Sequence, residues 1–201
     1  MRTVPACAAI CTLSLAALAS ADIYVFDNAV AYQVFCNDMN VVTQTQNFTT
    51  FSGSYVPGLS GGSGDYAWTA TAASGVFVDA LSNARTQATS DTLVFTFLST
   101  NVYSVGGNFF NLRADGTQKD GIMKIRLSDG TNFIRTVTNT TTFSGFVSDG
   151  LNITSVEISH AGSSAPNSFV ASNGFSIGAV PAPGAMALIG LAGCVARRRR
   201  A

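Results

Sequence analysis

Hydrophobic and polar residues alternate in short runs along the middle of this chain. In residues 123–127 every second position is strongly apolar (Met123, Ile125 and Leu127), and Lys124 and Arg126 lie between these positions. Such alternation places the apolar side chains on one face of a β-strand. Asp129-Gly130, a dipeptide typical of tight hairpin turns, comes next, and residues 133–137 resume the pattern. The stretch predicts a β-hairpin.

Similar runs recur about every ten residues, as in all-β proteins. They lack the i, i+3, i+4 apolar spacing of a long amphipathic helix. They predict strands at 92–98, 103–110, 142–147, 152–159 and 169–177, and earlier strands at 23–26, 31–35, 66–71 and 75–79. The pattern therefore indicates an all-β sandwich or barrel.

Three places interrupt this regularity. Gly106-Gly107 predicts a bulge or a bend within its strand, and the broken alternation near Thr154-Ser155 predicts a second bulge. Residues 36–65 are polar and rich in glycine, and we expect a loop there with one strand at 47–51.

The first 21 residues have the order of a secretory signal. Met1-Arg2 gives a positive start, residues 6–19 are apolar or small, and Ala19-Ser20-Ala21 fits an A-x-A cleavage site. The apolar run is too short to span a bilayer. We therefore predict a signal peptide at 1–21, with cleavage after Ala21. The alternative is an N-terminal core helix.

The last 22 residues divide into three parts. They are a proline-rich break, an apolar run at 185–196 and a basic cluster; the break is Val180, Pro181, Ala182, Pro183 and Gly184, and the cluster is Arg197, Arg198, Arg199 and Arg200. As a helix, the apolar run would rise about 18 Å against a hydrocarbon core of about 30 Å, and arginine side chains can snorkel across part of the shortfall. The arginines would stay on the cytoplasmic side. We predict a short hydrophobic helix that tethers an exported body to the membrane.

This tail resembles the PEP-CTERM sorting signal of exported bacterial proteins. The resemblance implies an exosortase-type membrane protease as partner, cleavage near the prolines, and release to the cell surface or the exopolysaccharide matrix. The usual Pro-Glu-Pro is Pro181-Ala182-Pro183 here. A plain C-terminal membrane anchor is the alternative.

The body also resembles the domain found with many such tails, over about residues 92–178. The matching stretches are 102–110, 115–116, 127–131, 143–146 and 153–158. The resemblance implies a jelly-roll-like β-sandwich and assigns no activity. We thus expect a signal peptide at 1–21, a sandwich at 22–179 and a sorting segment at 180–201.

Charge and cysteine content narrow the possible partners. Residues 22–179 contain eleven acidic and six basic residues, a net charge of −5. An acidic surface repels phosphate backbones, which argues against nucleic acid. Cys36 is the one cysteine of this region, so it has no disulfide of its own and no cysteine-rich metal site. We expect a buried thiol, with an intermolecular bridge as the alternative.

Candidate catalytic and metal-binding residues are few. Gly58-Leu59-Ser60-Gly61-Gly62 fits G-x-S-x-G, with His160 as the only histidine to serve as base. A nucleophile elbow needs a strand before it and a helix after it, and Pro57 and the glycines after Ser60 favour a loop instead. We therefore predict no catalytic site.

Asp115 and Asp120 flank a polar loop that could bind Ca²⁺ through carboxylate and carbonyl oxygens. Turn formation explains both aspartates equally well. Calcium is the only cofactor that we consider.

Four aromatic residues could form a platform on which sugar rings stack: Tyr55, Tyr66, Trp68 and Tyr103. Core packing is the more common use of aromatic residues in a β-protein, and we expect it here. Together these features predict a surface or matrix protein of structural or adhesive type. The alternatives are a carbohydrate-binding module, with or without calcium and with polysaccharide as partner, and, less favoured, a secreted hydrolase.

Overall fold

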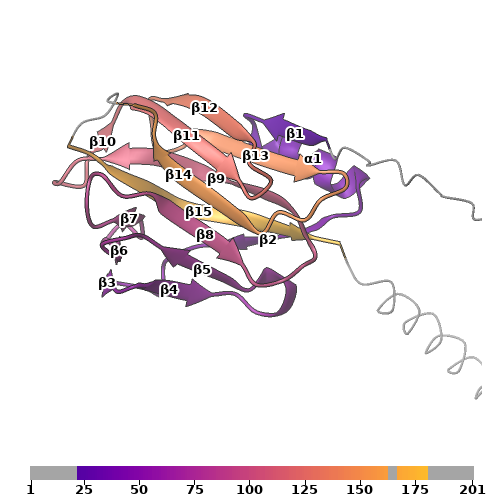
Figure 1. Ribbon diagram of the computed structural model, residues 1–201, viewed down its shortest axis with the longest axis horizontal. Helices are drawn as coiled ribbons and strands as arrows, with labels where there is room; N and C mark the ends of the chain where they lie inside the picture. Colours follow the sequence, from indigo (N-terminus) through magenta and orange to yellow (C-terminus); the bar gives the residue numbers. More distant parts are fainter. Residues whose placement is uncertain (1–21, 163–166, 181–201) are drawn as a thin grey trace, which may run out of the picture.

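The computed structural model describes residues 22–162 and 167–180, and within them the chain is mostly β-strand. The strands form two antiparallel sheets, accompanied by one α-helix, α1 (Ala29–Asp38), and a short 3-10 turn, η1 (Gly64–Tyr66). Figure 1 shows the two sheets lying one in front of the other. The predicted all-β class is confirmed at this level.

The larger sheet has nine strands among the described residues. Its order is β1 (Ile23–Phe26), β13 (Phe143–Ser148), β9 (Val102–Leu112), β15 (Phe169–Ala179), β7 (Ala84–Thr86), β6 (Val76–Val78) and β3 (Gly53–Tyr55), while β10 (Gln118–Lys119) pairs with β9 and β2 (Val42–Gln46) pairs with β15. The second sheet has six strands in the same part of the chain. Its order is β12 (Asn132–Val137), β11 (Gly121–Leu127), β14 (Ser155–His160), β8 (Leu93–Phe97), β5 (Trp68–Thr71) and β4 (Gly58–Gly61).

Aromatic side chains from both sheets meet in one buried core. The Trp68 ring lies edge-on to Phe175 of the larger sheet, with ring centroids 5.2 Å apart. The centroid of the Phe95 ring lies 4.5 Å from that of Phe175. Trp68 is only 1% exposed. Fully burying such a side chain contributes about 2–3 kcal/mol, so this contact between sheets is a main source of stability.

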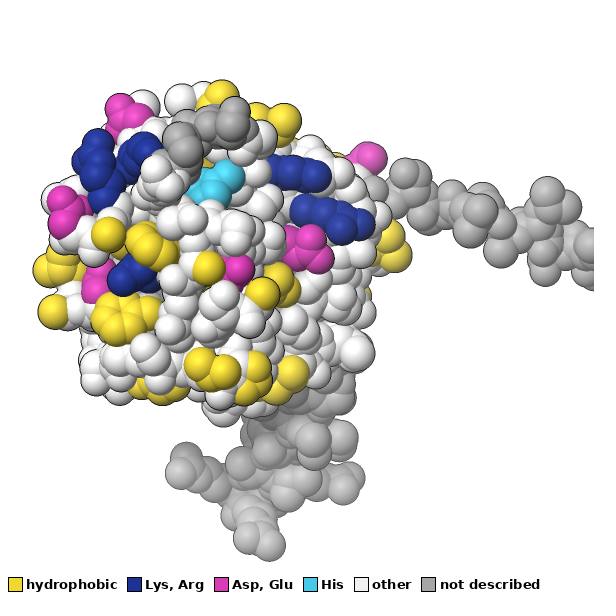
Figure 2. Space-filling model, turned by 60° about the vertical axis from the view of Figure 1, so that its left-hand side comes forward, with side chains coloured by type: hydrophobic (Ala, Val, Ile, Leu, Met, Phe, Trp, Pro, Cys, Tyr) yellow, Lys and Arg dark blue, Asp and Glu magenta, His cyan; other side chains and the backbone are white. Residues whose placement is uncertain are grey.

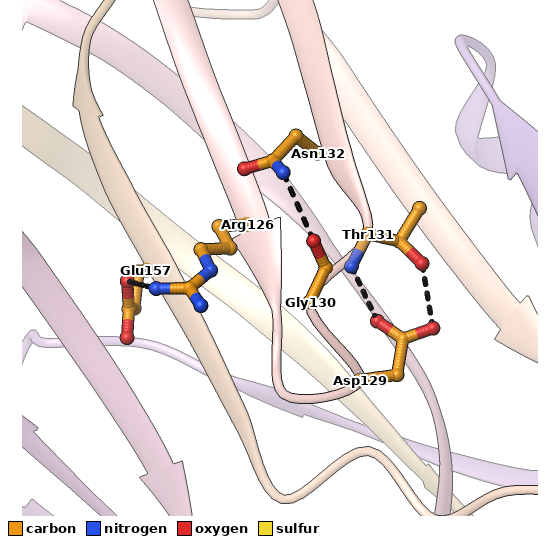
Figure 3. Close-up of polar contacts among 6 residues, drawn as sticks. All are labelled: Arg126, Asp129, Gly130, Thr131, Asn132 and Glu157. Atoms are coloured by element: carbon orange, nitrogen blue, oxygen red, sulfur yellow. Dashed lines mark hydrogen bonds and ion pairs between the residues drawn. The ribbon is translucent and has the colours of Figure 1, made fainter.

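The predicted hairpin is present, as β11 and β12 paired in register. Figure 3 shows its turn: the Asp129 carboxylate accepts hydrogen bonds from the backbone N–H of Thr131 at 2.9 Å and from its hydroxyl at 2.6 Å. Gly130 has a φ of +91°, which glycine adopts without strain. The sequence pattern therefore identified both strands and the turn.

Residues 31–35 are helical and not a strand, so that prediction was wrong. The side chain of Asn28 caps α1 by accepting hydrogen bonds from the backbone N–H groups of Val30 and Ala31, at 2.8 and 3.1 Å. Tyr32 and Cys36, four residues apart, are both buried and lie on the same side of the helix. Capping and this one-sided burial outweigh the alternation that suggested a strand.

The polar stretch 36–65 was also misjudged. It contains β2, β3 and β4, whereas the strand expected at 47–51 is absent. Pairing with neighbouring strands stabilises these short segments, and this information is absent from their own sequence.

The bulges lie elsewhere than predicted. Strand β14 begins at Ser155 and pairs without interruption, and β9 runs through Gly106 and Gly107. One irregularity is in the partner β15, where Asn173 and Gly174 lie opposite the single residue Asn108. A second register shift lies between Gly178 and Ala179, where Tyr103 of β9 is the extra residue.

Candidate functional site

Most residues of the predicted processing signals lie outside the described part of the chain. These are Ala19, Ala21, Pro181–Gly184, the apolar run 185–196 and Arg197–Arg200. Val180 is described: its backbone N–H donates to the carbonyl of Asn101 at 3.2 Å, and its side chain packs near α1. No helix among the residues described has the length and hydrophobicity to cross a membrane.

The structure does not bring Ser60 and His160 together. Ser60 lies on β4 and His160 ends β14, with β5 and β8 between them. Ser60 aligns across the sheet with Ser155, which lies five residues before His160 on β14. The Cα atoms of Ser60 and His160 are therefore roughly 20 Å apart. The Nε2 atom of His160 instead lies 2.9 Å from the carbonyl oxygen of Ser168. The serine-hydrolase hypothesis therefore loses its only candidate base.

Asp115 takes part in a turn. Its carboxylate accepts hydrogen bonds from the backbone N–H and the hydroxyl of Thr117, at 2.9 and 2.6 Å, and these bonds lower the pKa of this fully exposed group. Asp120 is exposed, and the described ranges contain no cluster of three or more His, Cys, Asp or Glu suited to a metal. The geometry favours the turn interpretation, and calcium binding at this loop stays an untested alternative.

The same turn recurs at two of the Asn-x-Thr sequences. Asn47 accepts from the backbone N–H and hydroxyl of Thr49, and Asn139 does so from Thr141. A carboxylate or amide oxygen that bonds the backbone two residues later is a common way to stabilise a turn. Asp/Asn-x-Thr is thus a repeated structural device in this chain.

The four aromatic candidates pack against the hydrophobic cores, as expected: Trp68 is buried and the three tyrosines are half-buried. Trp68 is buried and its indole N–H donates to Gln46, while Tyr55 and Tyr66 pack against the main core. Tyr103 packs in the smaller cluster beneath α1. Because Trp68 is buried, the four rings together do not form one exposed stacking surface.

A concave feature lined by converging polar groups lies on the outer face of the nine-stranded sheet, beside α1. We call it the α1 cleft. Its volume is about 330 Å³, and its lining is Ala29, Tyr32, Gln33, Thr45, Gln46, Asn47, Gly106, Gly107, Asn108, Phe143, Asn173, Gly174, Phe175 and Ser176. Strands β13, β9 and β15 provide the floor, and α1 and β2 provide the sides.

Two glycines, which have no side chain, make room for the aromatic rings beside the α1 cleft. Gly106 and Gly145 face each other across β9 and β13. A Cβ on Gly106 would lie 2.6 Å from the Phe143 ring, and one on Gly145 would lie 2.7 Å from the Tyr32 ring. The two glycines therefore let both rings lie directly on the sheet.

The bulge in β15 supplies the polar wall of the α1 cleft. Gly174 has a φ of +151°, which favours glycine, and the extra residue changes the direction of Asn173. The Asn108 amide donates to Asn173 Oδ1 at 3.2 Å, and the Asn173 amide donates to the carbonyl of Thr140 at 3.3 Å. This chain of hydrogen bonds fixes the orientation of both amides.

A cluster of three buried polar side chains anchors α1 next to the α1 cleft. The hydroxyls of Tyr32 and Ser104 lie 2.8 Å apart, and the Cys36 thiol donates to Ser104 Oγ at 3.4 Å. Burial raises the pKa of both Tyr32 and Cys36, so both stay protonated at neutral pH. Cys36 is fully buried, as expected for a structural thiol.

The α1 cleft carries no charged side chain. None of its fourteen lining residues is Asp, Glu, Lys, Arg or His. Figure 2 shows basic and acidic side chains interspersed on another face of the body. An uncharged cleft on a body with a net charge of −5 favours a neutral ligand over an ionic one.

Sequence reasoning did not find this site. The Gly106-Gly107 pair was a visible signal, but its partner Gly145 and the bulge at Gly174 become neighbours only through strand pairing. No protein-family model matches the chain, and no curated protein is similar to it. Function must therefore be inferred from the geometry of the body and the character of the two chain ends.

Proposed function

We propose that this chain is an exported protein of the cell surface or extracellular matrix, with a structural or adhesive role. In this proposal residues 1–21 direct export and residues 180–201 act as a PEP-CTERM-like sorting segment read by an exosortase-type protease. The body is a jelly-roll-like β-sandwich. Its two facing antiparallel sheets with a shared core support that description.

The observation that carries this proposal is the position of the two ends of the described body. Asp22 bonds to Asp149 beyond the end of β13, and Val180 bonds to Asn101 before the start of β9. Since β13 and β9 are antiparallel, both ends emerge from the same end of the body, beside α1 (Figure 1). A tether through the C-terminal segment would therefore hold one end near the membrane and present the opposite end outward.

A carbohydrate-binding module is the second candidate function. The uncharged α1 cleft, with its ordered amides and one partly exposed aromatic ring, is the observation that favours it. Both functions are compatible with export to a polysaccharide-rich surface.

The intact mass and location of the protein in its native host test the proposed function. We expect the mature protein to lack residues 1–21 and part of 180–201, and to fractionate with the cell surface or matrix. In a Pro181→Ala/Pro183→Ala variant, the basic cluster should be retained, because the cleavage motif is lost. Pro166→Ala is the matched control and should be processed normally. A cytoplasmic protein that retains residues 1–21 would overturn the proposal.

A further inference from the structure

We infer that the α1 cleft binds a single neutral sugar residue within a polysaccharide chain. This inference rests on the proposed surface function and names the ligand class of that function. Nothing in the sequence assigns the site, because its residues come from α1, β2, β9, β13 and β15.

The size of the α1 cleft limits its ligand. Its volume of about 330 Å³ lies at the lower end of the range of about 300–1,000 Å³ for small-molecule sites. Such a volume suits one ring with its substituents. Because the site is on the outer face of the sheet and α1 covers only one side, the rest of a polymer can continue outside it.

The absence of charge restricts the ligand further. A phosphate, sulfate or uronate would find no Arg, Lys or His among the lining residues, and an amine would find no carboxylate. Desolvating an ion without a partner is costly, so ionic ligands are disfavoured. A neutral ligand rich in hydroxyl groups avoids this penalty.

The polar groups suit hydroxyl groups. With its Nδ2 held by Asn173, Asn108 presents Oδ1 as an acceptor, and the exposed Thr45 hydroxyl can both donate and accept. Gln33 is held by hydrogen bonds to Asn37 and Thr43, at 3.2 and 2.8 Å. The Asn108 and Gln33 side chains are thus oriented before a ligand arrives, which reduces the entropy lost on binding.

Phe143 supplies the apolar surface that a sugar ring needs on one face. It is half-buried, lies over Gly106, and is supported by Tyr32 at 5.5 Å between ring centroids. A pyranose has polar hydroxyls around its edge and C–H groups on its faces. An aromatic wall beside fixed amides complements both parts of such a ring.

Titration of the mature body with defined oligosaccharides, followed by NMR of backbone amides, tests this inference. The probes are neutral trimers of glucose, mannose and N-acetylglucosamine, with a trimer of galacturonic acid as the charged comparison. We expect at least one neutral trimer to shift the amides of Gly106, Gly107 and Asn108, with a dissociation constant at least about tenfold lower than that of the acidic trimer.

A pair of matched variants distinguishes this site from the rest of the surface. Thr45→Trp fills the α1 cleft and should weaken binding at least about tenfold, because the indole occupies the ligand volume. Thr136→Trp makes the same change at an exposed position on the other sheet and should leave binding unchanged. Thermal unfolding of both variants verifies that each is folded.

Three results would overturn the inference: no shift with any neutral trimer at millimolar concentration, shifts confined to other residues, or equal weakening by both tryptophan variants. These failures are distinct from failure of the proposed function. A correctly exported and processed protein that binds no neutral trimer would refute the sugar site alone. A protein that stays in the cytoplasm would refute the surface function, whatever the titration shows.

Discussion

The outer faces of the two sheets differ in a way that strand composition alone does not reveal. The six-stranded sheet carries an uncovered row of hydroxyl side chains, one on each of four neighbouring strands, at Ser60, Thr69, Thr96 and Ser155. The nine-stranded sheet is partly covered by α1 and contains the α1 cleft. One face is thus a regular polar surface, and the other is shaped around a cavity.

The difference shows what a concave site on a β-sheet requires. Regular strands place side chains at even intervals, which produces a nearly uniform surface. On the nine-stranded sheet, Gly106 and Gly145 remove side chains where two rings must lie, and the bulge at Asn173-Gly174 changes the direction of one amide. Local departures from strand regularity therefore create the candidate site.

The largest expected effect comes from removing the anchor of α1. Tyr32 is 2% exposed, so Tyr32→Ala should lower the free energy of unfolding by about 3–5 kcal/mol and open the α1 cleft. Tyr24→Ala is the matched control, because Tyr24 lies nearby but is 39% exposed, and it should cost less than about 1.5 kcal/mol. Urea unfolding measures both. Equal costs would mean that α1 is not held through Tyr32.

The glycine floor gives the next largest effect. Gly106→Ala places a methyl group against the Phe143 ring and should cost about 1–3 kcal/mol through overpacking. In a Phe143→Ala background the same substitution should cost at least about 1 kcal/mol less, because the ring that it meets is gone. A double-mutant cycle based on urea unfolding measures this coupling. A coupling near zero would show that the glycine has no packing role there.

The contrast between the two faces also explains how much could be predicted from the sequence. The hairpin of β11 and β12 was predicted correctly because its signals are local: alternation along each strand and an Asp-Gly turn between them. The same holds for the strand at 23–26 and for the buried state of Cys36. These features depend on neighbours in sequence, or on the general tendency of apolar groups to be buried.

The α1 cleft depends on neighbours in space. Residues 31–35 alternate as a strand would, yet the Asn28 cap and the two glycines beneath Tyr32 make a helix the better solution. The bulge was predicted at Gly106-Gly107 and occurs in the partner strand, since only pairing decides which strand holds the extra residue. Long-range pairing was therefore the missing information.

High pH should destabilise the helix-covered face. Burial holds the pKa of Cys36 and Tyr32 above their ordinary values of 9.0 and 10.0, so the unfolded chain loses these protons first. Their contribution to stability is complete below pH 9 and is lost as pH rises above it. The free energy of unfolding should therefore fall as the pH rises from 9 to 10, and Cys36→Ala should make this fall smaller, because one of the two titrating groups is gone. Urea unfolding at a series of pH values measures this; identical slopes for both proteins would refute it.

The smallest effect is expected on the uncovered face. Figure 3 shows Arg126 and Glu157 as an ion pair with 3.5 Å between Nη1 and Oε2, and both side chains are largely exposed, at 51% and 41%. Solvent screens such a pair, so a double-mutant cycle with Arg126→Ala and Glu157→Ala should give a coupling of about 0.5 kcal/mol or less. Raising the salt concentration to about 1 M should reduce it further, because screening then acts over about 3 Å. A coupling above about 1.5 kcal/mol would mean that this face is held together as tightly as the face that carries α1, and the contrast between the two faces would no longer hold.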